Sequence, residues 1–258
     1  MRAIALLITL LGVGSIDAGV KTKTIEYDHD GTKLVGFLAY DDATNDKRPG
    51  VLVVHEWWGL NDYAKKRATM LAEMGYVAFC PDMYGNGQVT EHPKEAGKMA
   101  QTVRMNVATW QARAKAGLKV LTSQEQTDTK NLAAIGYCFG GSTALQLAYV
   151  GSDLKAVCTF HAALPTPTDE QAKAIKAKIL ICHGADDAFI SKESIEKFKK
   201  GLDHAKAKYQ FESYPGAVHS FTVPEADKKE LKGMAYNEAA DKKSWQQMKD
   251  LFKEAFGK

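Results

Sequence analysis

The stretch 135–141 constrains the fold of this chain more than any other segment. It reads Ile-Gly-Tyr-Cys-Phe-Gly-Gly and overlaps the end of an apolar, strand-like run over residues 132–135. The residues after it have the composition and spacing of a helix. A strand therefore turns sharply into a helix at Cys138. At such a corner the residues two before and two after must lack a Cβ, and Gly136 and Gly140 meet that demand.

The pattern Gly-x-Cys-x-Gly matches the nucleophile elbow Gly-x-Ser-x-Gly, with sulfur in place of oxygen. The helix that begins behind the sulfur favours the thiolate over the thiol. The amide of Phe139 points to where an oxyanion would form. The motif alone leaves a second interpretation, in which Cys138 is a small buried residue in a glycine-rich turn.

Length and composition indicate one globular domain. A chain of 258 residues can bury one sizeable core, and 45% apolar with 25% charged residues is ordinary for such a protein. The net charge of +3 is too small to predict nucleic-acid binding, and no stripe of Lys and Arg alternates with aromatic residues. We expect a monomer.

The N-terminus has the pattern of a secretory signal. Arg2 precedes the apolar run Ala3–Val13, which small residues follow. The run is too short to span a bilayer comfortably, so we expect no stable membrane insertion once the signal is removed. We predict a signal peptide over residues 1–18 and a single domain over residues 19–258, located in the periplasm or secreted. An uncleaved N-terminal anchor is the alternative.

Three of the four cysteines lie away from the elbow. Cys80, Cys158 and Cys182 occur in or at the end of apolar, strand-like runs, where a free thiol packs as a small hydrophobic group. An oxidising compartment permits disulfides. We predict three buried free thiols, with a bridge between Cys158 and Cys182 as the alternative if their strands are neighbours.

The remaining sequence predicts alternating strands and helices. Segments 25–29 and 33–40 alternate apolar and polar residues and predict a β-hairpin. Further strands are expected over residues 51–54, 76–80, 132–135, 154–160, 179–182 and 209–214. Helices are expected over residues 61–74, 99–121 and 241–256. The order predicts an α/β fold of the α/β-hydrolase type, a doubly wound, mostly parallel sheet with helices on both faces.

Functional residues gather at the carboxyl ends of the strands in such a sheet. Glu56 follows one predicted strand, Cys138 another, Asp186 and Asp187 a third, and His219 the last. A thiol, a carboxylate and an imidazole occur in the order nucleophile, acid, histidine, which is the chain order of α/β-hydrolases. These placements together favour a nucleophilic hydrolase over a glycine-rich structural turn.

Five segments have a more specific pattern, namely 55–61 (HEWWGLN), 80–85 (CPDMYG), 136–141 (GYCFGG), 183–190 (HGADDAFI) and 219–221 (HSF). On these motifs the chain resembles the dienelactone hydrolase (carboxymethylenebutenolidase-like) family of α/β-hydrolases, whose distinguishing feature is a cysteine nucleophile. The resemblance runs from about residue 25 to residue 256 in element order.

The resemblance implies a catalytic triad. Cys138 is the implied nucleophile, His219 the general base, and Asp187 the carboxylate that fixes the tautomer of the histidine. The pattern His-Gly-x-x-Asp places the acid four residues after His183, and this spacing favours Asp187. Asp186 is the alternative acid.

The resemblance also implies that Glu56 lies beside the thiol and that the amides of Trp57 and Phe139 form the oxyanion hole. Glu56 is either a second proton acceptor, which activates the thiol when substrate binds, or a buried carboxylate that is hydrogen-bonded to the backbone. We interpret His161, at the end of the strand after the elbow, as a structural histidine with satisfied hydrogen bonds. No two histidines have metal-ligand spacing, so we predict no metal and no cofactor.

The chain departs from the family at the positions that would hold an anionic substrate. The two arginines of the founding enzymes correspond to Asn86 and Val223, and neither residue can make a bidentate ion pair with an anion. A neutral or differently oriented small-molecule ester, lactone or thioester is therefore as well supported as the acid-substituted lactone. The candidate substrate-binding residues are Trp58, Tyr84, Asn86 and Phe221.

We expect a cysteine hydrolase that cleaves a carboxylic ester or lactone through an acyl-cysteine intermediate. A thioesterase or acyltransferase is the alternative among enzymes. A non-catalytic module that binds a hydrophobic ligand on the same fold is the alternative from another class. The complete set of thiol, acid and imidazole argues against a binding module, because a binder needs none of the three.

Overall fold

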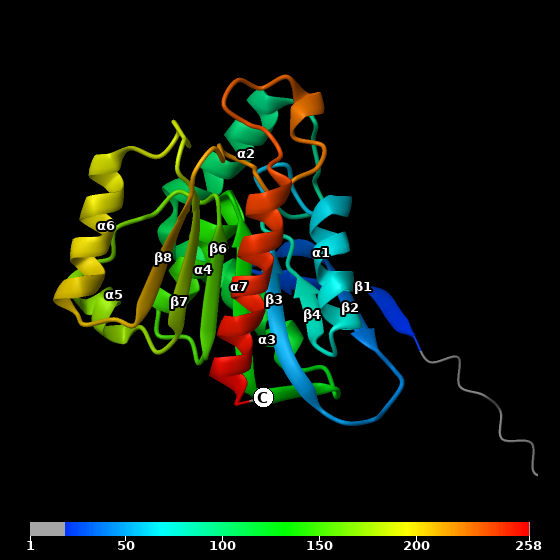
Figure 1. Ribbon diagram of the computed structural model, residues 1–258. Helices are drawn as coiled ribbons and strands as arrows, with labels where there is room; N and C mark the ends of the chain where they lie inside the picture. The colour runs from blue at the N-terminus through cyan, green and yellow to red at the C-terminus, as the bar shows by residue number, and fades with distance from the viewer. Residues whose placement is uncertain (1–18, 258) are drawn as a thin grey trace, which may run out of the picture.

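The computed structural model describes residues 19–257. They form one eight-stranded sheet with helices on both faces (Figure 1). The predicted signal peptide, residues 1–18, lies outside the described residues, as does Lys258, so signal cleavage and export stay predictions. Among the described helices, none is long and apolar enough to cross a membrane.

The sheet has the order β1-β2-β4-β3-β5-β6-β7-β8. Its strands are β1 (Val20–His29), β2 (Thr32–Asp41), β3 (Arg48–Val54), β4 (Val77–Cys80), β5 (Thr127–Tyr137), β6 (Ala156–Phe160), β7 (Lys178–Gly184) and β8 (Tyr209–Tyr214). The hairpin β1–β2 and the pair β2–β4 are antiparallel, and the other neighbouring strands are parallel. The predicted fold class is therefore confirmed.

Two helical layers bury the faces of the sheet. The helices are α1 (Asp62–Glu73), α2 (Pro93–Met105), α3 (Val107–Thr122), α4 (Phe139–Tyr149), α5 (Asp169–Ala174), α6 (Lys192–His204) and α7 (Glu238–Phe256), with a short 3-10 helix, η1 (Asp227–Lys229). Apolar side chains of α1 and α7 pack on one face. Those of α2, α3, α4 and α6 pack on the other, so the central strands are buried on both sides (Figure 1).

The prediction of one long helix over residues 99–121 is wrong. The segment forms two helices, α2 and α3, that meet at Asn106. The Asn106 side chain accepts a hydrogen bond of 3.0 Å from the amide of Thr109, so it caps the second helix, as asparagine commonly does. The break places Arg104 in the last turn of α2, beside the elbow residue Phe139.

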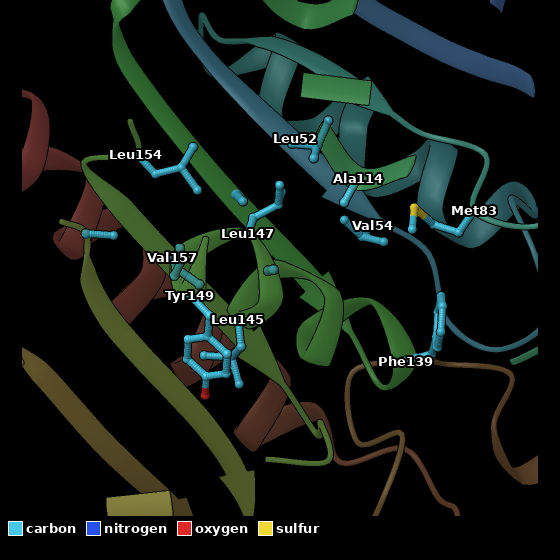
Figure 2. Packing of buried hydrophobic residues seen from close by; sticks show 14 of the residues in the cluster. Leu52, Val54, Met83, Ala114, Phe139, Leu145, Leu147, Tyr149, Leu154 and Val157 are labelled. Atoms are coloured by element: carbon cyan, nitrogen blue, oxygen red, sulfur yellow. The ribbon is translucent and has the colours of Figure 1, made fainter. Parts of the chain in front are cut away.

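The elbow packs on a continuous apolar layer. Figure 2 shows Leu52 and Val54 of β3 near Ala114 of α3, with Leu147 of α4 in the same layer. Each of these four side chains is fully buried. Strand β3 and the helices α3 and α4 are therefore held together by close packing, which helps to fix the position of the residues that follow β3.

The backbone at Cys138 has the strained conformation that the motif predicts. Its φ is 51° and its ψ −112°, which side-chain-bearing residues rarely adopt. A Cβ added to Gly136 would lie 2.0 Å from the carbonyl oxygen of Gly140, and one added to Gly140 would lie 2.1 Å from that of Val54. Both glycines are therefore required by close backbone approach.

The four cysteines are buried and free. Cys158 and Cys182 lie on the adjacent strands β6 and β7, with their sulfur atoms 4.0 Å apart. A disulfide has a sulfur–sulfur separation of about 2.0 Å. The structure therefore has the predicted free thiols and not the alternative bridge.

The contact at the elbow predicts a large difference between two substitutions of glycine by alanine. Gly136→Ala lowers the free energy of unfolding by ~2–3 kcal/mol, because the new methyl group overlaps backbone that cannot move. The control is Gly97→Ala in α2, where the added Cβ meets only a Trp57 ring atom at 3.7 Å and helix propensity favours alanine. Urea unfolding measures both, and equal stabilities would contradict the account of the elbow.

Candidate active site

Four of the predicted catalytic side chains lie at the carboxyl edge of the sheet. Glu56 follows β3, Cys138 follows β5, Asp187 follows β7 and His219 follows β8. Asp187 and His219 are each 5% exposed, and the Asp187 Oδ2 lies 2.7 Å from the His219 Nδ1. The alternative acid, Asp186, is exposed and accepts a hydrogen bond from the amide of Gly216. The structure thus brings Asp187, and not Asp186, against the histidine.

Cys138 and His219 line one cavity of about 230 Å³. Its other lining residues are mostly apolar and comprise Trp57, Arg104, Ala163, Phe189, Ile190 and Met234. The cavity therefore exposes a thiol and an imidazole to a small molecule while most of its wall repels water.

The imidazole of His219 has a strongly raised pKa. Burial opposes the charged form, but the Cys138 sulfur and the Asp187 carboxylate outweigh burial and raise the pKa of His219 to about 10. Because Asp187 contacts Nδ1, the other ring nitrogen, Nε2, is left to exchange a proton with the sulfur. The site can therefore remove a proton from the thiol and hold it.

Glu56 is a buried carboxylate near His219 and Ser220. It is 2% exposed, and its Oε1 accepts a hydrogen bond of 3.2 Å from the Ser220 hydroxyl. Burial raises the pKa of Glu56 to about 7, against the opposing effects of His219, Ser220 and Lys229. The carboxyl can therefore exist in either protonation state near neutral pH, as a proton acceptor requires.

The loop after β3 is held by His55. The amide of Met83 donates to the Nε2 of His55 at 3.3 Å, so the proton of this buried imidazole is on Nδ1, which contacts the carbonyl oxygen of Glu56. Among the described residues, neither the amide of Trp57 nor that of Phe139 has a hydrogen-bond acceptor. Both N–H groups are thus free to receive an oxyanion.

The four predicted substrate-binding residues lie outside the lining of this cavity. Trp58 is buried under the side chain of Lys229, and Phe221 is fully buried against His161 and Tyr214. The hydroxyl of Tyr84 donates to the Trp57 carbonyl, and the ring lines a separate cavity of about 400 Å³.

Asn86 is exposed in a turn at φ 55°, where its amide donates to the carbonyl of Lys33. None of the four lines the cavity with Cys138, so their role in substrate binding stays a prediction. Sequence position placed them near a strand end, but three of the four side chains are used in packing or in holding loops.

The structure adds lining residues that the sequence argument missed. Arg104 comes from the end of α2, Ala163 from the segment after β6, and Met234 from the loop after η1. Phe189 and Ile190 belong to the motif that contains Asp187 but were not assigned to the site. Only the asparagine at position 106 signalled that a helix would end beside the elbow.

Comparisons with known proteins agree with this geometry. The fold and the edge-clustered site define an α/β-hydrolase. The sequence profile described as "Dienelactone hydrolase family" matches residues 34–256. The chain therefore belongs to the dienelactone hydrolase family, and it is a hydrolase of the ester or lactone type.

Similar proteins span most of the chain. "Protein usf" of Aquifex pyrophilus is 28% identical over 201 residues, which cover 76% of this chain and 85% of that protein. The solved structure of "m3DLH" is 39% identical with a TM-score of 0.89, covering 92% of this chain and 99% of the other. A dienelactone hydrolase-like promiscuous phosphotriesterase from metagenomic libraries is 37% identical, with the same TM-score and the same coverage.

The contact between thiol and imidazole predicts how His219 titrates. Because the sulfur of Cys138 favours the charged imidazole, Cys138→Ala lowers the pKa of His219 from about 10. NMR titration of the imidazole nitrogens measures the change. Cys158→Ala removes a buried sulfur elsewhere in the sheet and leaves the titration unaltered. An unchanged His219 pKa in Cys138→Ala would show that the two groups do not interact.

Proposed function

We propose that this hydrolase cleaves carboxylic esters or lactones through a triad of Cys138, His219 and Asp187, with an acyl-cysteine intermediate. The observation that supports the proposal best is the 2.7 Å contact between Asp187 and His219, in a cavity that also exposes the thiol at a strained turn. This arrangement supplies a nucleophile, a base and a group that orients the base.

The proposed reaction has two halves. His219 takes the proton of the Cys138 thiol, and the thiolate attacks the carbonyl carbon of the substrate. The amides of Trp57 and Phe139 stabilise the oxyanion, and the leaving alkoxide departs with the proton from His219. In the second half, His219 deprotonates a water molecule that attacks the thioester. The acid product leaves, and the thiol is restored.

A thiolate nucleophile favours some acyl donors over others. It is itself a good leaving group, so acyl transfer to the sulfur suits an activated ester or a lactone, whose own leaving group departs readily, better than an amide. Thioesters are the second candidate substrates for the same reason. A solved relative with 37% identity is titled a promiscuous phosphotriesterase, so a neutral phosphotriester belongs in the substrate panel.

Substitutions of the triad test the proposal. With a p-nitrophenyl ester and a neutral lactone, Cys138→Ala lowers kcat/KM by at least about 10³-fold, and Asp187→Asn by about 10²–10⁴-fold because the histidine loses its tautomer. Asp186→Asn is the matched control and changes kcat/KM by less than about threefold. Equal rates for wild type and Cys138→Ala would remove the thiol from the mechanism and favour the binding module.

Arg104 places a positive charge in the wall of the cavity, and it is not among the site residues that the family resemblance implies. Its guanidinium lies 5.4 Å from the centre of the Phe139 ring, and it lines both the cavity with Cys138 and an adjoining cavity of about 330 Å³. The walls of the adjoining cavity are largely apolar, with Trp110, Leu164 and Pro165 among them. We therefore propose that an acyl group with a distal anion enters from the side of α2.

A charge-matched pair of esters tests this orientation. For p-nitrophenyl hemisuccinate, Arg104→Met lowers kcat/KM about tenfold, an effect limited by solvent exposure of the arginine, while p-nitrophenyl butyrate changes by less than about twofold. Arg104→Lys retains part of the preference. Lys98→Met, on the same helix but lining the separate cavity with Tyr84, is the control. Equal losses for the two esters would contradict a charge-specific role.

A further inference from the structure

His161 combines burial with an unsatisfied polar atom. It follows β6 at φ 41°, is fully buried, and its amide donates to the carbonyl of Cys182 at 2.9 Å. Its Nδ1 has no hydrogen-bond partner among the described residues. The interpretation of His161 as a fully satisfied structural histidine is therefore wrong. A strained backbone and an unsatisfied buried nitrogen both cost stability, which points to a functional reason.

The ring lies directly behind the proposed catalytic groups. Its Nδ1 is 4.0 Å from the Oε1 of Glu56, and its Nε2 is 2.8 Å from the Oγ1 of Thr222. The ring also makes an edge contact with the imidazole of His219, with centroids 5.3 Å apart. His161 thus joins Glu56 to a second set of buried polar groups.

This second set of buried polar groups is a chain of hydrogen bonds, and Arg67, which is always positively charged, is at its far end from His161. Arg67 has only donors; its Nη2 donates to Asp241 and to the Thr222 carbonyl, and its Nε donates to the Tyr63 hydroxyl at 3.2 Å. The Tyr63 hydroxyl lies 2.6 Å from the Thr222 Oγ1 but 3.2 Å from the Thr222 carbonyl, which already accepts from Arg67. The geometry therefore favours donation from Tyr63 to Oγ1.

The direction of this chain decides the tautomer of His161. If the Thr222 Oγ1 accepts from Tyr63, its own proton goes to the Nε2 of His161. Nε2 is then an acceptor, and the single proton of the neutral ring is on Nδ1, facing Glu56. Burial lowers the pKa of His161 well below its ordinary value, so the ring stays neutral.

We propose that His161 is a positioning residue whose Nδ1–H, oriented through Thr222 and Tyr63 from Arg67, keeps the Glu56 carboxylate ionised. This role rests on the proposed function and adds to it the interpretation of Glu56 as a second proton acceptor, which activates the thiol when substrate binds. The N–H dipole favours the charged carboxylate across 4.0 Å, and the low polarity of the site strengthens the effect.

Other groups also act on Glu56 and enter the design of the test. The ionisable or charged groups around Glu56 and His161 are His219, Lys229, Tyr63, Arg67 and Tyr137. Ser220 donates to the same carboxylate oxygen. His161→Phe and Thr222→Val leave all of these side chains in place. Thr222→Val removes a hydrogen-bond partner of Tyr63, and His161→Phe changes the ring that contacts His219, so a shift of the Glu56 titration shared by both variants reports the N–H.

The test compares pH profiles of kcat/KM for a neutral ester. His161→Phe removes the N–H, and Thr222→Val removes the hydroxyl that orients it. Both substitutions destabilise the ionised Glu56 carboxylate and so raise its pKa. The acidic limb of the kcat/KM profile therefore moves to higher pH by up to about one unit. The value of kcat/KM at pH 6 falls about three- to tenfold, with little change at pH 9. His161→Asn, which keeps an N–H near the Nδ1 position and tolerates positive φ, restores the wild-type limb.

Two further variants complete the design. Thr159→Val makes the same change as Thr222→Val at a buried hydroxyl of β6 that has no partner in the described chain, and it leaves the profile unaltered. Glu56→Gln abolishes the acidic limb. A ¹³C NMR titration of the Glu56 carboxyl, with each substitution made in the Cys138→Ala protein, measures the same change in the pKa of Glu56 without requiring activity. This measurement remains valid even if the triad mechanism is wrong.

Three results would overturn the role of His161. One is a rate reduced by the same factor at every pH, which is the mark of a merely structural residue. The second is an acidic limb that survives Glu56→Gln. The third is a Glu56 titration that does not change in Thr222→Val. Wild-type rates in Cys138→Ala would instead overturn the triad while leaving the carboxyl titration to decide on His161.

Discussion

The approach of the first turn of α4 to the end of β3 is the contact on which the rest of the site depends. No Cβ fits at Gly140, because the carbonyl oxygens of Val54 and His55 occupy that space. The loop after β3 is thereby pressed against the elbow, so Trp57 lines the same cavity as Cys138. The positive φ of Cys138 is maintained because buried strands on both sides leave the chain no alternative route.

The two carboxylates of the site, Asp187 and Glu56, have different environments. Asp187 is hydrogen-bonded to His219 and helps to raise the pKa of the imidazole, while burial holds the pKa of Glu56 near 7. Groups with separated acidities can take separate roles in one reaction. The proposed chain from Arg67 to His161 would act against the burial of Glu56, since it directs an N–H dipole toward a carboxylate that burial would otherwise neutralise.

The fold and the central residues could be predicted because their signals are local. Glycines flank the elbow, strand ends have polar residues, and the spacing after His183 selected Asp187 over Asp186. The residues that form the walls of the cavity could not be predicted, because they come from segments far apart in the chain. Arg104 reaches the site only because a helix breaks at Asn106, and the groups that orient His161 come from α1 (Tyr63) and the loop after β8 (Thr222). Aromatic residues near strand ends could not be assigned to substrate binding from the sequence, because packing and substrate binding use the same side chains.

The central claim is that the acyl group of the substrate is transferred to the sulfur of Cys138. Acid quenching of a steady-state reaction with a slowly deacylated ester, followed by peptide mass spectrometry, tests it directly. The account predicts one added acyl group on the peptide that contains Cys138, lost on treatment with neutral hydroxylamine and absent from the Cys138→Ala protein. Turnover with no acylated peptide, or an acyl group on a different residue, would contradict it.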